Sequence, residues 1–214
     1  MLITYLHGFA SNPDVWQSQP KGYAPKLDLS DLKKECARLG GELPDNTTLV
    51  GWSMGGMLAL KMALDFPNKI KSLVLVSTSP KFVAGDDYPC GLSPVILRKI
   101  RKDIKRGGIV VFHHLAFKDD RFPGKEIVSI DKAIQELDEL ERIDLREALN
   151  KIKVPTLIIH GEKDEICLPS AAEYLHNRIA GSRLVILKDV WHAPQLEVPE
   201  KFNACLKEFI GHAA

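Results

Sequence analysis

Short apolar runs alternate along the chain with longer stretches in which apolar residues recur at helical spacing. The predicted strands cover residues 2–6, 47–52, 73–76, 154–159 and 184–187, with a weaker one at 26–29. The predicted helices cover residues 32–39, ended by Gly40 and Gly41, then 57–66, ended by Pro67, and a closing helix from about residue 200. Continuous apolar strands separated by helices favour an α/β fold, with a mostly parallel sheet of about six strands flanked by helices on both faces.

The interval 81–148 breaks this alternation. It holds several helical patterns and no convincing buried strand, and its charge changes sign along its length. Residues 98–106 carry six basic residues and one acidic residue, whereas residues 131–147 carry seven acidic and three basic residues. We therefore expect a core of residues 1–80 and 149–214, into which residues 81–148 are inserted as a helical cap, or lid.

Composition excludes several classes of protein. The 214 residues include 29 Lys and Arg against 28 Asp and Glu, and a net charge of +1 gives no field that would attract nucleic acid or an anionic membrane. The apolar runs are far shorter than the ~20 residues that span a bilayer, and the first residues have no basic segment or cleavage site typical of a signal peptide. The four cysteines are far apart and lack metal-binding spacing: Cys36, Cys90, Cys167 and Cys205. We expect a soluble, cytoplasmic, monomeric protein without nucleic-acid or membrane partners.

The most informative motif is Gly51-Trp52-Ser53-Met54-Gly55. A predicted strand enters this G-x-S-x-G pattern and a predicted helix leaves it, which is the context that a nucleophilic serine requires. The alternative is a glycine-rich turn that binds phosphate, but neither G-x-x-x-x-G-K nor G-x-G-x-x-G is present to support it. Ser53 is the candidate nucleophile.

A serine hydroxyl needs a base to take its proton. His192 follows the last predicted strand and precedes the last helix, which places it at the carboxyl edge of the sheet, where open α/β sheets build their sites. His160 ends a strand and is a candidate for a supporting role. The other candidates are expected to be solvated or structural: His113, His114, His176 and His212.

The base in turn needs an acid that fixes its tautomer and stabilises its charged form. Three acidic residues compete in the loop after strand 154–159: Glu162, Asp164 and Glu165. Asp164 stands at the apex of that loop, so we favour it, although a solvated acidic turn is the alternative.

Two backbone N–H groups are needed to stabilise the oxyanion of an acyl-transfer intermediate. One is the amide of Met54, directly after the candidate nucleophile. The second is expected in the loop after the first strand, where Phe9 is the donor and Gly8 permits the close approach.

In this order along the chain, Ser53, Asp164 and His192 resemble the α/β-hydrolase superfamily, and the resemblance covers nearly the whole chain. Within it the sequence most resembles the pimeloyl-[acyl-carrier-protein] methyl ester esterases of biotin synthesis, through residues 51–56, 77–94, 143–149 and 191–194. The resemblance implies hydrolysis of the methyl ester of a pimeloyl chain on acyl-carrier protein, without a cofactor or metal. The chain departs from the family because it lacks the hairpin before the first strand, shortens the loop after the next strand, and has Met54 where leucine is common.

The cap supplies candidate binding residues for such a substrate. Acyl-carrier protein is acidic, and a basic helix face could dock it. Four basic residues at i, i+3, i+4 and i+7 share one face: Arg98, Arg101, Lys102 and Lys105. A solvated face, neutralised by the acidic part of the cap, is the alternative. Four aromatic residues are expected to contact the acyl chain, or to be ordinary core: Trp52, Phe82, Phe112 and Phe117.

Two other classes of function stay open. One is a broad-specificity carboxylesterase or thioesterase that acts on small free acyl esters, with the cap as a simple lid. The other is a non-enzymatic receptor or scaffold that retains the three residues. Perhydrolases, lyases and C–C hydrolases use the same residues, so sequence alone does not separate these chemistries.

Overall fold

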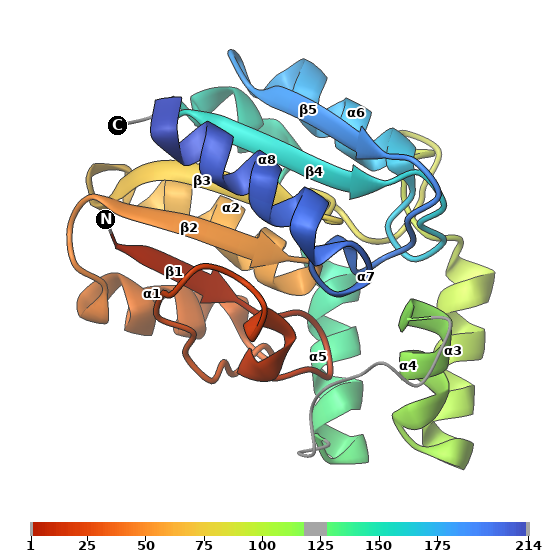
Figure 1. Ribbon diagram of the computed structural model, residues 1–214. Coiled ribbons are helices and arrows are strands. Elements are labelled where there is room, and N and C mark those ends of the chain that lie inside the picture. Colours follow the sequence, from red (N-terminus) through yellow and green to blue (C-terminus); the bar gives the residue numbers. More distant parts are fainter. Residues whose placement is uncertain (1, 118–127, 213–214) are drawn as a thin grey trace.

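The computed structural model describes residues 2–117 and 128–212. Within them a single parallel sheet of five strands lies in the order β1-β2-β3-β4-β5 (Figure 1). The strands are β1 (Ile3–Leu6), β2 (Thr47–Trp52), β3 (Ile70–Val76), β4 (Thr156–Gly161) and β5 (Arg183–Leu187). Leu6 pairs with Gly51, and Gly51 pairs with Leu75, so the carboxyl ends of neighbouring strands meet at one edge.

Helices cover both faces of the sheet. They are α1 (Leu32–Glu42), α2 (Met54–Asp65), α3 (Pro94–Gly107), α4 (Val110–Phe117), α5 (Ile130–Arg142), α6 (Pro169–Arg178), α7 (Pro194–Glu197) and α8 (Pro199–His212), with 3-10 turns at Pro13–Trp16, Pro67–Lys69 and Arg146–Lys151. In Figure 1, α8 crosses one face, while α1, α2 and α6 lie behind the other. Every residue of β2 is buried, which agrees with the continuous apolar pattern of a sheet covered on both sides. In residues 2–117 and 128–212, none of the helices has the length and apolar character that a membrane crossing requires.

The strand predicted at residues 26–29 is wrong. Leu27 and Leu29 are buried while Lys26 and Asp28 are exposed, so the alternation is real, but it reflects two leucines packed on the core rather than pairing with a strand. The Leu27 N–H instead donates to Nε2 of the buried His7 at 3.1 Å. Burial lowers the pKa of His7 to about 4, so this ring is a neutral acceptor at pH 7.

The helix end predicted at Gly40 and Gly41 is also wrong, because α1 continues through both residues to Glu42. A Cβ at Gly40 would overlap the ring of Phe66, whereas a Cβ at Gly41 would meet nothing within 4 Å. Gly40 therefore permits close packing inside the helix rather than ending it. The helix predicted from residue 57 begins at Met54, directly after Ser53.

Three helices lie beside the carboxyl ends of the strands, outside the layers that cover the sheet (Figure 1). We refer to α3, α4 and α5 as the cap helices. α3 buries Leu97, Ile100 and Ile104, and it packs against both α4 and α5. Within 81–148, residues 118–127 lie outside the described residues, and the division of the chain into core and cap stays a prediction.

The two outer edges of the sheet differ. Along β1, Tyr23 pairs with the strand, because the Tyr5 N–H donates to the Tyr23 oxygen and the Tyr23 N–H donates to the Ile3 oxygen, both at 2.8 Å. At the opposite edge lies β5, in which Ile186 is 39% exposed.

Candidate active site

Ser53 occupies the sharp turn between β2 and α2. Its backbone lies in the left-handed region, with φ 54° and ψ −122°, which a non-glycine residue adopts only when its surroundings hold it there. The Ser53 N–H donates to the Val76 oxygen at 2.9 Å, and Thr78 Oγ1 donates to the Ser53 oxygen at 2.6 Å. A Cβ at Gly51 would overlap the Gly55 carbonyl, so the strand and the helix approach each other more closely than larger residues permit. The chain thus forces the Ser53 side chain out of the turn.

Three side chains form a continuous hydrogen-bonded chain at the carboxyl edge of the sheet. Ser53 Oγ lies 3.0 Å from His192 Nε2, and His192 Nδ1 lies 2.8 Å from Asp164 Oδ2. Ser53 follows β2, Asp164 follows β4 and His192 follows β5. The three residues are 7%, 3% and 2% exposed in the order Ser53, Asp164, His192. The structure therefore brings together the three residues that the sequence singles out.

Asp164 is held as a charged group although it is fully buried. Burial alone would raise the pKa of its carboxyl, but the charge of His192 and hydrogen bonds from His160 and His192 outweigh burial and hold that pKa well below its usual range. Asp164 Oδ1 accepts the N–H groups of Ile166 at 2.9 Å and Cys167 at 3.0 Å. His160 Nε2 lies 3.2 Å from Asp164 Oδ2, in agreement with the supporting position expected for it.

The other two acidic residues of this loop lie at the surface rather than beside His192. Glu162 and Glu165 are both exposed, and Glu162 accepts the Asp189 N–H at 3.1 Å.

The loop after β1 lies against Ser53. A Cβ on Gly8 would be 3.0 Å from the Ser53 Cβ, so only glycine leaves this approach unstrained. Among the described residues, neither the Phe9 N–H nor the Met54 N–H has a hydrogen-bond acceptor. In the described residues, the amides directly after Gly8 and Ser53 are therefore left without an acceptor, as the donors of an oxyanion-binding site must be.

The aromatic residues predicted to contact the acyl chain are all buried: Trp52, Phe82, Phe112 and Phe117. Trp52 stacks at an angle between Phe117, with ring centroids 5.7 Å apart, and His192, with ring centroids 5.4 Å apart. Its indole N–H donates to the His192 carbonyl at 2.7 Å, so Trp52 also fixes the backbone of the candidate base. Phe112 meets Phe9 edge-on at 4.7 Å. Three of the four residues thus gather around the candidate site, whereas Phe82 lies in the loop after β3.

The predicted basic face lies on α3. Three of its members are exposed and have no ion-pair partner within the described part of the chain: Arg98, Lys102 and Lys105. Arg101 differs, because it pairs with Asp138 at 2.5 Å and Glu141 at 2.9 Å, both on α5. The four residues and Arg106 line a surface groove of about 470 Å³. The acidic helix thus neutralises one of the four predicted charges.

Two buried cap residues contact the loop after β1: Glu136, which sequence reasoning missed, and His113, which was expected to be solvated or structural. Glu136 Oε2 accepts the Ala10 N–H at 3.0 Å, and His113 Nε2 lies 2.9 Å from the Ala10 oxygen. The signal for Glu136 was its spacing from the buried Ala133 and Leu140, which places it on the apolar face of α5.

Comparisons with known proteins agree with this geometry. The sequence pattern of the alpha/beta hydrolase family matches residues 6–204. A pimeloyl-[acyl-carrier protein] methyl ester esterase of Neisseria meningitidis serogroup B (strain H44/76) is 34% identical over 202 residues, which cover 88% of this chain and 78% of that protein. An esterase of the same name from Nitrosomonas europaea is 26% identical over 234 residues, which cover 95% of this chain and 93% of that protein.

A solved structure of an esterase has a similar fold. The esterase EaEST from Exiguobacterium antarcticum matches with a TM-score of 0.85 and 27% sequence identity, over 99% of this chain and 92% of that chain. Together, the matched pattern, the similar sequences and the shared fold show that this chain belongs to the alpha/beta hydrolase family and resembles its pimeloyl-[acyl-carrier protein] methyl ester esterases.

Proposed function

We propose that this chain is a cytoplasmic carboxylic ester hydrolase that removes the methyl ester from a pimeloyl chain carried on acyl-carrier protein, a step of biotin synthesis. The observation that carries the proposed chemistry is the hydrogen-bonded chain from Ser53 through His192 to Asp164. The names of the similar esterases supply the substrate.

The first half of the reaction forms an ester on the serine. The Ser53 hydroxyl donates to His192 Nε2, so His192 takes the proton as Ser53 Oγ attacks the ester carbonyl carbon. Asp164 accepts the Nδ1–H of His192 and stabilises the positive charge that forms on the ring. The N–H groups of Phe9 and Met54 stabilise the oxyanion of the tetrahedral intermediate. The intermediate collapses when His192 returns the proton to the methoxy oxygen, and methanol leaves.

The second half releases the acid. A water molecule gives one proton to His192 and attacks the carbonyl carbon of the acyl-serine. The second intermediate breaks the bond to Ser53 Oγ, which takes the proton back from His192. The products are the free carboxylate end of the acyl chain and the original enzyme, so the cycle needs no further reactant.

Two groups of residues favour a substrate that is carried on an acidic protein. The exposed charges of Arg98, Lys102 and Lys105, which no described acidic residue pairs, would attract it and orient it on α3. The buried rings of Phe112 and Phe117, packed against Phe9 and Trp52, would contact the acyl chain between α3 and the serine.

A second candidate is an esterase for small free esters. It is favoured by the structural likeness to EaEST, which is named an esterase, and by the pairing of Arg101 with acids of the same chain.

The experiment measures kcat/KM on the methyl ester of pimeloyl-acyl-carrier protein and on dimethyl pimelate, with Ser53→Ala as the blank. We expect a preference for the carrier-bound ester, weakened by salt. The double change Arg98→Glu with Lys102→Glu should lower kcat/KM for the carrier-bound ester at least tenfold and leave dimethyl pimelate unchanged. Lys207→Glu, on the exposed side of α8, is the matched control.

Each outcome assigns the function. Equal or better turnover of dimethyl pimelate would select the second candidate. Hydrolysis that survives Ser53→Ala, or failure of a fluorophosphonate to label Ser53, would reject the serine mechanism for both.

A further inference from the structure

Ala10 is held from both sides by the cap helices. It directly follows Phe9 and adopts a left-handed backbone with φ 47°, which a residue with a Cβ keeps only where neighbours hold it. Its N–H donates to Glu136 Oε2 on α5 at 3.0 Å, and its carbonyl oxygen lies 2.9 Å from His113 Nε2 on α4. Both polar groups of one strained residue are thus bound by cap side chains.

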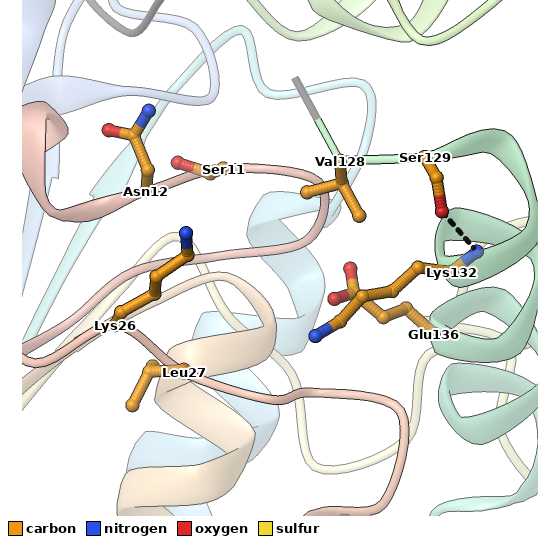
Figure 2. Close-up of a pocket in the computed structure, with 8 residues that line it drawn as sticks. All are labelled: Ser11, Asn12, Lys26, Leu27, Val128, Ser129, Lys132 and Glu136. Atoms are coloured by element: carbon orange, nitrogen blue, oxygen red, sulfur yellow. Dashed lines mark hydrogen bonds between the residues drawn. The ribbon is translucent and has the colours of Figure 1, made fainter. Parts of the chain in front are cut away.

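Glu136 is unlike the other acids of its helix. It is 2% exposed, whereas Asp138 and Glu141 lie at the surface and pair with Arg101. Figure 2 shows its carboxyl group pointing from α5 towards the segment that carries Ser11. Glu136 also lines a pocket of about 270 Å³. Burial raises the pKa of Glu136 to about 7, although the Ala10 N–H and the charge of Lys132 favour its ionised form. Among the described residues, the donor that this buried carboxyl binds is the Ala10 N–H, so the contact with the loop after β1 satisfies its hydrogen bonding.

We infer that Glu136 and His113 are positioning residues that fix the oxyanion-binding loop. Glu136 accepts the Ala10 N–H and so holds the peptide plane that follows Phe9, while within the described part of the chain the Phe9 N–H has no acceptor. His113 fixes the next carbonyl, and Phe112 packs edge-on against the Phe9 ring. The inference rests on the proposed acyl transfer at Ser53.

The consequence is that the cap completes the catalytic machinery. The loop that carries Phe9 and Ala10 follows β1 of the sheet, but three contacts from α4 and α5 set its conformation. A shift of a donor by about 1 Å can lower turnover about 10²-fold without changing which groups contact the substrate.

The test compares Glu136→Leu, Glu136→Gln and His113→Leu in the full chain, with dimethyl pimelate as substrate. Asp131→Asn, which removes an exposed carboxylate from the same helix, is the matched control. For Glu136→Leu we expect kcat to fall about 10- to 100-fold while KM changes less than threefold, because a donor to the transition state is misplaced. Glu136→Gln keeps a carbonyl acceptor for the Ala10 N–H and should recover at least a third of the wild-type kcat.

A second readout reports on the oxyanion site itself. A trifluoromethyl ketone adds to the serine and places an oxyanion in that site, so its Ki should rise in parallel with the loss of kcat/KM. Thermal unfolding confirms that each variant is folded, and if Glu136→Leu does not fold, His113→Leu and Glu136→Gln decide the question.

The two possible failures are distinguishable. If the wild type does not hydrolyse the ester in a Ser53-dependent way, the proposed function fails. If the wild type is active but folded Glu136→Leu and His113→Leu keep its kcat and Ki, or change KM alone, the positioning role is overturned.

Discussion

Replacing Asp164 by asparagine changes one oxygen of a buried carboxylate into an NH2 group and leaves the shape of the side chain intact. Oδ1 accepts the N–H groups of Ile166 and Cys167, so the amide oxygen must stay at that position and the NH2 must take the place of Oδ2. The NH2 then faces His192 Nδ1, which can accept its proton only if the ring proton moves to Nε2. In that tautomer His192 can no longer accept the proton of Ser53.

The magnitude follows from the loss of the base. A serine hydrolase whose histidine is held in the wrong tautomer loses about 10⁴-fold in kcat. At about 1.4 kcal/mol for each factor of ten, this is about 5 kcal/mol of transition-state stabilisation. His160 does not relieve the conflict, because its Nε2 lies 3.2 Å from the same carboxylate oxygen and 2.7 Å from the Cys167 carbonyl, to which it donates.

The assay is steady-state hydrolysis of dimethyl pimelate from pH 6 to 9, with Glu162→Gln as the control. Glu162 is exposed and an amide oxygen still accepts the Asp189 N–H, so this control should retain the wild-type kcat. An Asp164→Asn protein that folds and retains more than a tenth of the wild-type kcat would refute the role assigned to the carboxylate.

Two further predictions concern stability. Gly40→Ala should destabilise the fold by about 1–3 kcal/mol because its Cβ would overlap the Phe66 ring. Gly41→Ala has open space around it and should stabilise α1 by up to about 1 kcal/mol. Equal melting temperatures for the two variants would contradict this packing. Burial raises the pKa of Glu136 from 4.5 to about 7, so between these pH values the folded state binds more protons than the unfolded state. The free energy of unfolding therefore falls as pH rises through this range, by at most about 3 kcal/mol. Glu136→Gln should therefore lose less stability than the wild type between pH 5 and pH 8 in urea unfolding, and parallel profiles would show that the carboxyl does not titrate in this range.

The local sequence carried enough information to find the catalytic candidates. The turn at Ser53 depends on glycines two residues before and after it, and those residues stand within one short motif. Asp164 and His192 follow directly after β4 and β5, and in a parallel sheet these positions meet at one edge. Position relative to predicted strands was therefore sufficient, even without knowledge of the side-chain contacts.

Contacts between distant segments were beyond such reasoning. Glu136 stands 126 positions after Ala10, and no local pattern indicates that a loop N–H needs a carboxylate from the cap. The wrong predictions of a strand at 26–29 and of a helix end at Gly40 have the same origin. Alternating burial does not reveal whether a partner strand is present, and a glycine needed for close packing resembles a glycine that ends a helix.

The two borders of the sheet differ in how they would resist pairing with a strand from another molecule. An unpaired strand is a template for adding another strand, and so for aggregation. On the β1 side, Tyr23 already occupies two of the backbone hydrogen bonds that an incoming strand would need. β5 is protected by other means, since it is five residues long, begins at Arg183, which is paired with Glu208, and is followed by Lys188. Charge reversal or apolar substitution at Arg183, which begins β5 at the end away from the edge that carries Ser53, Asp164 and His192, would therefore promote self-association at β5.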